Sequence, residues 1–186
     1  MNSKKIEIEV PAGKNAEWVN GVLTLVDEKD NRPVIERIKT FEDACKELGN
    51  DHQAVIDYYA ICDATSTKDI IAYAKLRVIA AALNEGWEPQ FTEDEWRYFP
   101  WFCFYTQKEI DEMDEEEKSR VVYRSGSYAN ARGGVAFAYT HYGSSYTNAN
   151  IGSRLAFKTR ELAEYAGKQF IEIWADFVFK PEEKQE

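Results

Sequence analysis

The chain is poor in cysteine, histidine and proline. Its 186 residues include three cysteines, two histidines and five prolines. Cys45, Cys62 and Cys103 stand far apart and form no C-x-x-C pair, which argues against a disulfide framework and against a cysteine zinc site. The sequence therefore predicts free, reduced thiols and an intracellular protein.

Long apolar runs and the common catalytic motifs are missing as well. No stretch approaches the ~20 apolar residues that a membrane span needs, and residues 1–10 lack the apolar core of a signal peptide. There is no P-loop, no G-x-G-x-x-G and no G-x-S-x-G. His52 and His141 are too far apart in sequence to form a spaced metal pair. We therefore expect a cytoplasmic protein with no membrane partner, no metal, no cofactor and no catalytic residue.

What the chain does contain is typical of a folded domain rich in aromatic rings. Hydrophobic residues make up 44% of the chain, charged residues 30% and aromatic residues 14%, which argues against a largely disordered protein. With 11 Tyr, 10 Phe and 5 Trp, rings are expected to dominate the core. The formal net charge of −10 argues against a protein that coats duplex DNA over its whole surface.

The first 38 residues are predicted to form a small β appendage. Apolar and charged residues alternate over 6–10, which is typical of a half-buried strand, and Pro11-Ala12-Gly13 is expected to end it. Asn20-Gly21 favours a hairpin turn, and a second strand is expected over Val22–Val26. Residues 34–38 are predicted to be a short third strand or a linker.

Helix signals begin at Thr40, where the pattern Thr40-x-x-Asp43 resembles a capping box. The same type of signal recurs at Ser66 and Thr106, and Gly49 is typical of a helix end. Gly167 lies in the middle of an expected helix, where a close crossing against another element would explain it. The helices predicted from these signals and from apolar periodicity cover residues 41–48, 53–62, 66–86, 106–118 and 159–178.

Short β candidates lie between these helices, at residues 101–105, 120–124, 134–140 and 154–158. This order predicts an α+β fold: an N-terminal β-hairpin, a helical segment, then a small antiparallel sheet packed by a long C-terminal helix. We expect residues 39–180 to form a single α+β domain and 181–186 a frayed acidic tail. Residues 96–105 contain seven aromatic rings and are expected to form a fully buried strand, with an exposed patch for a partner or a glycan as the alternative.

Charge is unevenly distributed along the chain. Residues 119–160 contain six bases and no Asp or Glu, a formal charge of +6, whereas the remainder holds 17 bases and 33 acids, or −16. The bases in this basic window are accompanied by tyrosines and glycines. Arg binds phosphate through its planar set of donors, and Tyr offers a surface on which unpaired bases stack.

The basic window is our candidate site for an anion or a nucleic acid. Its residues are Arg124, Tyr128, Arg132, Tyr139, His141, Tyr142, Arg154, Lys158 and Arg160. Three of the bases, Arg154, Lys158 and Arg160, are expected to cluster where a strand meets the capped start of the last helix, because a helix N-terminus favours anions. The hypothesis is a non-enzymatic binding protein acting on an anionic partner, with single-stranded nucleic acid preferred.

Two alternatives to this hypothesis stay open. The tyrosines also suit a sheet interior, and the bases can pair with the acidic segment 111–117. The protein would then be a protein-interaction or assembly component that self-associates as a homo-oligomer or docks an acidic protein surface. The second alternative is an enzyme of unrecognised type.

Two stretches carry a resemblance to a known family. They are residues 83–105, which begin Leu83-Asn84-Glu85-Gly86-Trp87, and residues 152–170, GSRLAFKTRELAEYAGKQF. Together they resemble an uncharacterised family of small proteins from Bacteroides-type gut bacteria, their prophages and related phages. The resemblance covers about residues 38–179 and implies a phage or prophage protein in the cytoplasm of a host cell. It implies no catalytic residue.

Overall fold

The computed structural model describes residues 8–27, 30–90, 92, 94–127, 131–144 and 153–178, with the backbone alone for residues 27, 124–127, 131–132, 143–144 and 153. The fold is α+β, as the sequence predicts. The chain divides into two units, Met1–Pro33 and Val34–Glu186, which are described separately. Among the described residues, no helix is long and apolar enough to cross a membrane.

The first unit contains an antiparallel hairpin. Strands β1 (Lys14–Val19) and β2 (Val22–Asp27) pair around Asn20 and Gly21, whose φ angles of 49° and 79° are those of a primed hairpin turn. The predicted turn and second strand are confirmed. The first strand was predicted too early: residues 8–10 are not in a strand, and β1 follows Pro11-Ala12-Gly13. A two-residue turn pairs its flanking residues directly, so β1 consists of the six residues immediately before Asn20.

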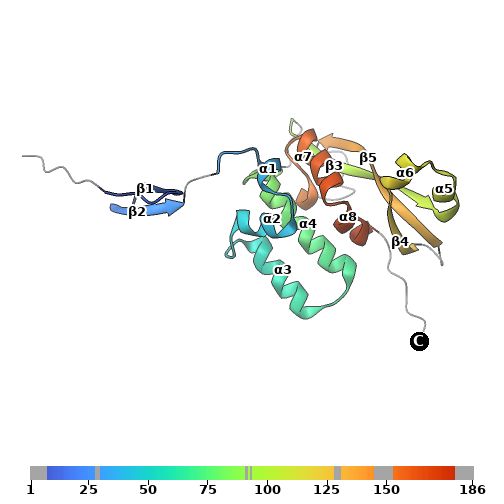
Figure 1. The fold of residues 1–186 in the computed structure, drawn as a ribbon, viewed down its shortest axis with the longest axis horizontal. Coiled ribbons are helices and arrows are strands. Elements are labelled where there is room, and N and C mark those ends of the chain that lie inside the picture. Colours follow the sequence, from blue (N-terminus) through green and yellow to red (C-terminus); the bar gives the residue numbers. More distant parts are fainter. Residues whose placement is uncertain are drawn as a thin grey trace, which may run out of the picture. The chain divides into compact units, whose positions relative to one another are not determined.

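The second unit (Figure 1) begins with four helices. Val34 and Ile38, predicted to lie in a strand or linker, are buried at helical spacing and joined by an Ile38 N–H to Val34 carbonyl bond of 3.0 Å. The capping box at Thr40 and Asp43 is confirmed. The helices are α1 (Val34–Arg37), α2 (Phe41–Leu48), α3 (Gln53–Ala64) and α4 (Lys68–Asn84).

Helix α4 begins one residue later than the predicted Ser66 cap. Its N-cap is Thr67, whose side chain makes no capping bond. The Thr65 hydroxyl instead accepts the Thr67 N–H at 3.1 Å, so the hydrogen bond is made within the turn before α4 and not to the first turn of the helix. The buried residues of α4 continue to Asn84, which places this helix at the centre of the largest core cluster.

A three-stranded antiparallel sheet forms the other half of this unit. Its order is β3-β5-β4. The predicted acidic helix is two short helices separated at Met113, because Asp114 starts a second capping box. The elements are β3 (Trp96–Thr106), α5 (Gln107–Glu112), α6 (Glu115–Ser119), β4 (Val122–Ser127) and β5 (Ala131–Ser144).

The predicted strand at residues 154–158 is wrong. The 3-10 helix η1 (Ser153–Leu155) is followed by a single bridge between Phe157 and Tyr98. Leu155, Ala156 and Phe157 are all buried, so the segment does not alternate between two faces. The buried Asn84 amide holds it by donating to the Ala156 carbonyl at 2.9 Å and accepting the Lys158 N–H at 3.0 Å.

Two C-terminal helices, α7 (Arg160–Gln169) and α8 (Ile171–Val178), replace the predicted single helix 159–178. Helix α7 ends at Phe170, whose N–H donates to the Ala166 carbonyl at 3.2 Å, and the Trp174 indole donates to the same carbonyl at 3.2 Å, which ties α8 to the end of α7. Both helices pack on one face of the sheet (Figure 1). The rings of Phe102 and Trp174, with centroids 5.3 Å apart, join α8 to β3.

Candidate functional site

The two faces of the sheet have different surroundings. Pro100 and Phe137 lie on the face that α7 covers, at the position of Gly167. Successive side chains of a strand point to opposite faces, so Trp101 and Tyr139, which pair directly across β3 and β5, face away from α7. Phe99 and His141 are the next directly paired residues on that same far face. The far face therefore carries Trp101, Tyr139 and His141, whereas the rings at the alternating positions, Trp96, Tyr98 and Tyr142, lie on the side of α7.

Five rings around the end of the β3–β5 pair form what we call the ring surface: Trp101, Tyr139 and His141 on the far face, and Trp96 and Tyr142 on the side of α7. Trp101 stacks on Tyr139 with centroids 6.1 Å apart and planes at 21°, and His141 lies 5.6 Å from Trp101. Tyr142 links His141, at 6.1 Å, to Trp96, at 5.1 Å. The exposed fractions are 53% for Trp96, 38% for Trp101, 51% for Tyr139 and 47% for Tyr142. So much exposed aromatic area in one connected group is typical of a binding surface.

Arg160 borders the ring surface at the first position of α7. Thr159 caps this helix by accepting the Leu162 N–H at 3.3 Å. The Arg160 guanidinium lies over Tyr142, 5.6 Å from the ring centroid, and over Tyr98 at 5.9 Å. It forms no ion pair with any carboxylate in the part of the chain that the structure describes. Hydrogen bonds from the Glu161 backbone and the Thr159 side chain hold the pKa of Glu161 below its usual value. The start of α7 therefore combines one cation with one ionised carboxylate.

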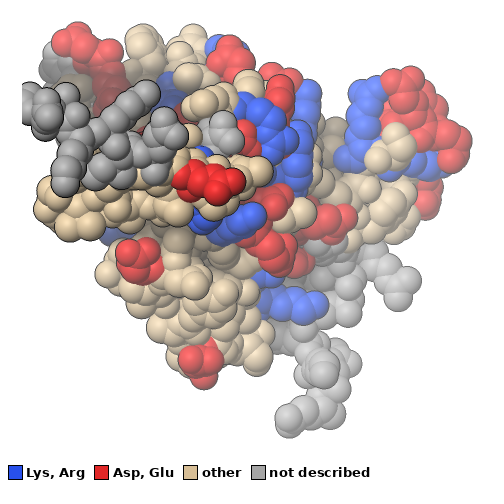
Figure 2. All heavy atoms as spheres, turned by 60° about the vertical axis from the view of Figure 1, so that its left-hand side comes forward, with Lys and Arg blue, Asp and Glu red and all other residues tan. Residues whose placement is uncertain are grey.

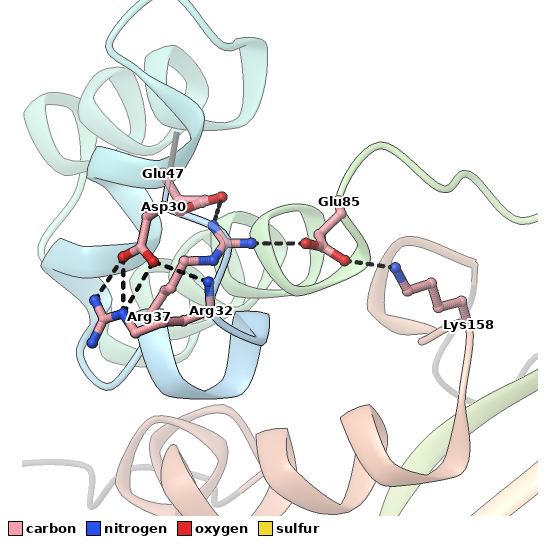
Figure 3. Close-up of polar contacts among 6 residues, drawn as sticks. All are labelled: Asp30, Arg32, Arg37, Glu47, Glu85 and Lys158. Atoms are coloured by element: carbon pink, nitrogen blue, oxygen red, sulfur yellow. Dashed lines mark hydrogen bonds and ion pairs between the residues drawn. The ribbon is translucent and has the colours of Figure 1, made fainter. Parts of the chain in front are cut away.

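Lys158 does not join this group. Its Nζ pairs with Glu85 Oε2 at 3.0 Å, and Arg37 Nη2 donates a hydrogen bond to Glu85 Oε1 at 2.7 Å (Figure 3). Arg37 also pairs with Glu47. These four side chains form a charge network between the end of α4, the first two helices and the segment before α7. The charge of Lys158 is thus already compensated by a carboxylate.

Arg154 lies elsewhere again. It lines a separate hollow of about 410 Å³ together with His52, Arg77 and Trp87. Arg77 pairs with Asp57 at 3.1 Å. The predicted cluster of Arg154, Lys158 and Arg160 at one junction is therefore not formed, because the chain between them folds as η1 and a buried turn rather than as a strand.

Two further predicted residues, Arg124 and Arg132, lie at the other end of the sheet. Arg124 on β4 pairs with Gly133, and Arg132 on β5 pairs with Ser125. The two arginines thus occupy neighbouring register positions; their side chains, and Tyr128 as a whole, lie outside the described residues. The structure brings together Tyr139, His141, Tyr142 and Arg160.

Sequence reasoning missed Trp96 and Trp101, which were expected in a fully buried strand. That expectation is wrong: three rings of β3, Trp96, Trp101 and Phe104, are exposed by 53%, 38% and 54%. The available signal was topological. With rings at nearly every position of a strand and helices α7 and α8 on one face, Trp101 faces away from those helices, whereas Trp96 and Phe104 lie on the helix side but stay exposed near the two ends of β3.

Acids and bases are interspersed on the face shown in Figure 2, where Lys and Arg lie beside Asp and Glu. Ion pairs inside α6 illustrate the pattern: Lys118 pairs with Glu115 at 3.5 Å, and Arg120 pairs with Glu116. Within the described ranges, no three His, Cys, Asp or Glu side chains are grouped so that they could hold a metal ion. The chemistry available at the ring surface is therefore stacking, with a local cation.

No family model, curated protein or solved structure matches the chain. The resemblance to a family of phage and prophage proteins therefore stays a prediction.

Proposed function

We propose that the protein is a non-enzymatic binding protein that holds single-stranded nucleic acid on its ring surface. The observation that carries the proposal is the contact of Trp101, Tyr139 and His141 on the far face with Tyr142 at the end of the sheet, where the Arg160 guanidinium lies over the Tyr142 ring. Unpaired bases stack on such rings whatever their sequence, and each stacked base contributes about 1–3 kcal/mol. Arg160 supplies a donor for a phosphate next to a stacked base.

A single strand suits this surface better than a duplex. The bases of a duplex are stacked on each other and cannot lie on protein rings, whereas the net charge of −10 opposes a long polyanion. Binding would therefore depend more on stacking than on charge, and its salt dependence should be shallow.

The cellular setting belongs to the same proposal. We place the protein in the cytoplasm of a host cell, in a phage or prophage context and without a cofactor. Cys45, Cys62 and Cys103 are unpaired, which fits a reducing compartment.

The alternative is a protein-interaction or assembly component. Trp and Tyr are enriched at the centres of protein interfaces, so the same exposed rings favour it. In that case an acidic surface, of a partner or of a second copy, would meet Arg160. Light scattering across a salt series, without nucleic acid, separates the two: assemblies that dissolve as salt rises support the alternative.

Stacking is tested by fluorescence anisotropy of a labelled 20-residue oligo(dT) at low salt. Tyr139→Leu keeps apolar area and removes the ring, so we expect binding about tenfold weaker, as for the loss of one stacked base. Tyr59→Leu is the matched control, because Tyr59 is 55% exposed on α3, away from the sheet. Equal binding by the two variants, or no binding of the wild type at micromolar protein, contradicts the proposal.

The role of charge is tested by reversal. Arg160→Glu should weaken oligo(dT) binding and reduce its salt dependence, since it removes one phosphate contact. Lys108→Glu is the control, because Lys108 on α5 is exposed and lies 3.9 Å from its nearest carboxylate, Glu112. If both reversals weaken binding equally, only the net charge matters and the local site is rejected.

A further inference from the structure

Strand β5 is longer than the neighbour on its outer side. It has 14 residues, and β4 pairs with it only from Ser127↔Ala131 to Val122↔Val135. Before Val122 the chain turns away into α6. Within the described ranges, β5 from Phe137 onward therefore pairs with β3 alone.

An open strand edge presents a row of main-chain N–H and C=O groups. Antiparallel pairing on the β3 side leaves alternate residues of β5 directed to the outer side. Thr140 illustrates this: its carbonyl accepts Arg160 Nη1 at 3.5 Å, at the outer limit of a hydrogen bond. Among the described residues, no main chain outside β3 bonds to the main chain of residues 137–140, so this edge can bond to a partner.

A groove of about 890 Å³ runs beside this edge. β5 bounds it on one side through Phe137, Ala138, Tyr139 and Thr140, and helices α7 and α8 bound it on the other. Val121, Val122 and Ile171 supply apolar surface between them. Ala138 is the extra residue where the β3–β5 register shifts, and its methyl group leaves room for another backbone.

The groove selects a partner by two kinds of chemistry. Only an extended polypeptide backbone presents donors and acceptors with the spacing of a neighbouring strand, which lies about 4.8 Å away. Charge adds a second requirement. Lys168 is paired with Glu164 at 2.5 Å and Arg120 with Glu116, which leaves Arg160 as the lining base without such a carboxylate among the described residues.

We propose that this groove binds a short extended peptide, which adds a strand to β5 in line with β4 and places an acidic side chain against Arg160. The stretch of β5 that lines the groove is short, so the segment needs about four to six residues. Its alternate side chains would contact the apolar surface at Val121 and Ile171. The inference does not rest on nucleic-acid binding, although Tyr139 and Arg160 belong to both surfaces.

The test uses capped six-residue synthetic peptides that alternate Val with Glu or Val with Lys. Binding to the full chain is measured by calorimetry and by amide shifts in NMR spectra. We expect the Glu peptide to bind at least tenfold more tightly than the Lys peptide, with the largest shifts at residues 137–140. A Glu peptide with N-methylated backbone amides should bind with at least tenfold lower affinity, because its main chain cannot donate hydrogen bonds to the edge of β5.

Variants separate charge from shape. Arg160→Glu should reverse the preference and favour the Lys peptide, whereas Lys108→Glu, on α5 and outside the groove lining, should leave both affinities unchanged. No binding at millimolar peptide overturns the proposal, as does binding that N-methylation does not weaken. The proposal is also rejected if oligo(dT) displaces the Glu peptide and if, in high salt, the protein no longer binds the Glu peptide more tightly than the Lys peptide. These two results together would identify a general site for polyanions.

Discussion

Gly167 is the residue at which α7 comes closest to the sheet. A Cβ at this position would lie 2.5 Å from Phe137 Cδ2 and 2.6 Å from Pro100 Cβ, well inside van der Waals contact. The prediction that this mid-helix glycine marks a close crossing is confirmed. The same contact keeps Phe137 and Pro100 on the covered face, and thereby leaves Trp101 and Tyr139 on the open one.

Replacing Gly167 tests this contact. Gly167→Ala should lower the free energy of unfolding by about 1–3 kcal/mol, because overpacking a ring and a proline outweighs the ~1 kcal/mol gain in helix propensity. Urea denaturation measures the change, with Asp63→Ala at an exposed position of α3 as the control. A variant as stable as the wild type would show that α7 and the sheet can move apart without any loss of folding free energy.

At the scale of elements, the helices depend on carboxylates at their N-termini. The Asp43 carboxylate accepts the Thr40 N–H at 2.9 Å and the Lys39 N–H at 3.0 Å. The hydrogen bond from the Lys39 backbone is the main reason that the pKa of Asp43 lies below its usual value. A similar bond from the Thr106 N–H, at 2.7 Å, lowers the pKa of Glu109 at the start of α5.

These caps predict an acid-dependent loss of stability. A carboxyl whose pKa is lower in the folded state stabilises the fold above about pH 4, and its contribution is lost as the pH falls through the folded pKa. Asp43→Asn should therefore be less stable than the wild type at pH 6, and the gap should shrink toward pH 3. Urea midpoints at both pH values measure this, with Asp63→Asn as the control. A gap that does not change with pH contradicts the role of the carboxylate charge.

At the scale of the whole molecule, every core cluster formed by the described residues lies in the second unit. The largest, around Leu76, Val78 and Trp174, and the two smaller ones all fall within residues 34–178. In the first unit, every side chain of β1 is exposed, and Trp18 is exposed by 74%. A two-stranded hairpin of this kind is marginally stable by itself.

This distribution predicts that residues 34–186 fold without the first unit. We expect a fragment that starts at Val34 to unfold cooperatively, with a free energy of unfolding within about 1 kcal/mol of that of the full chain. Circular dichroism during urea unfolding measures it, and oligo(dT) binding should persist because the ring surface lies in this fragment. A fragment that does not unfold cooperatively would show that the hairpin is needed for folding.

Local patterns in the sequence were enough for the α+β class, the turn at Asn20-Gly21, the cap at Thr40 and the crossing at Gly167. The turn and the cap depend on neighbours a few residues apart, and the crossing is signalled by a single residue without a side chain in the middle of a helix. Tertiary structure alone decided that Lys158 is neutralised by Glu85, that Trp101 is open rather than buried, and that α7 stops at Phe170. Those outcomes depend on contacts between segments far apart in the chain, and the spacing of residues within one segment carries no information about what will be packed against it.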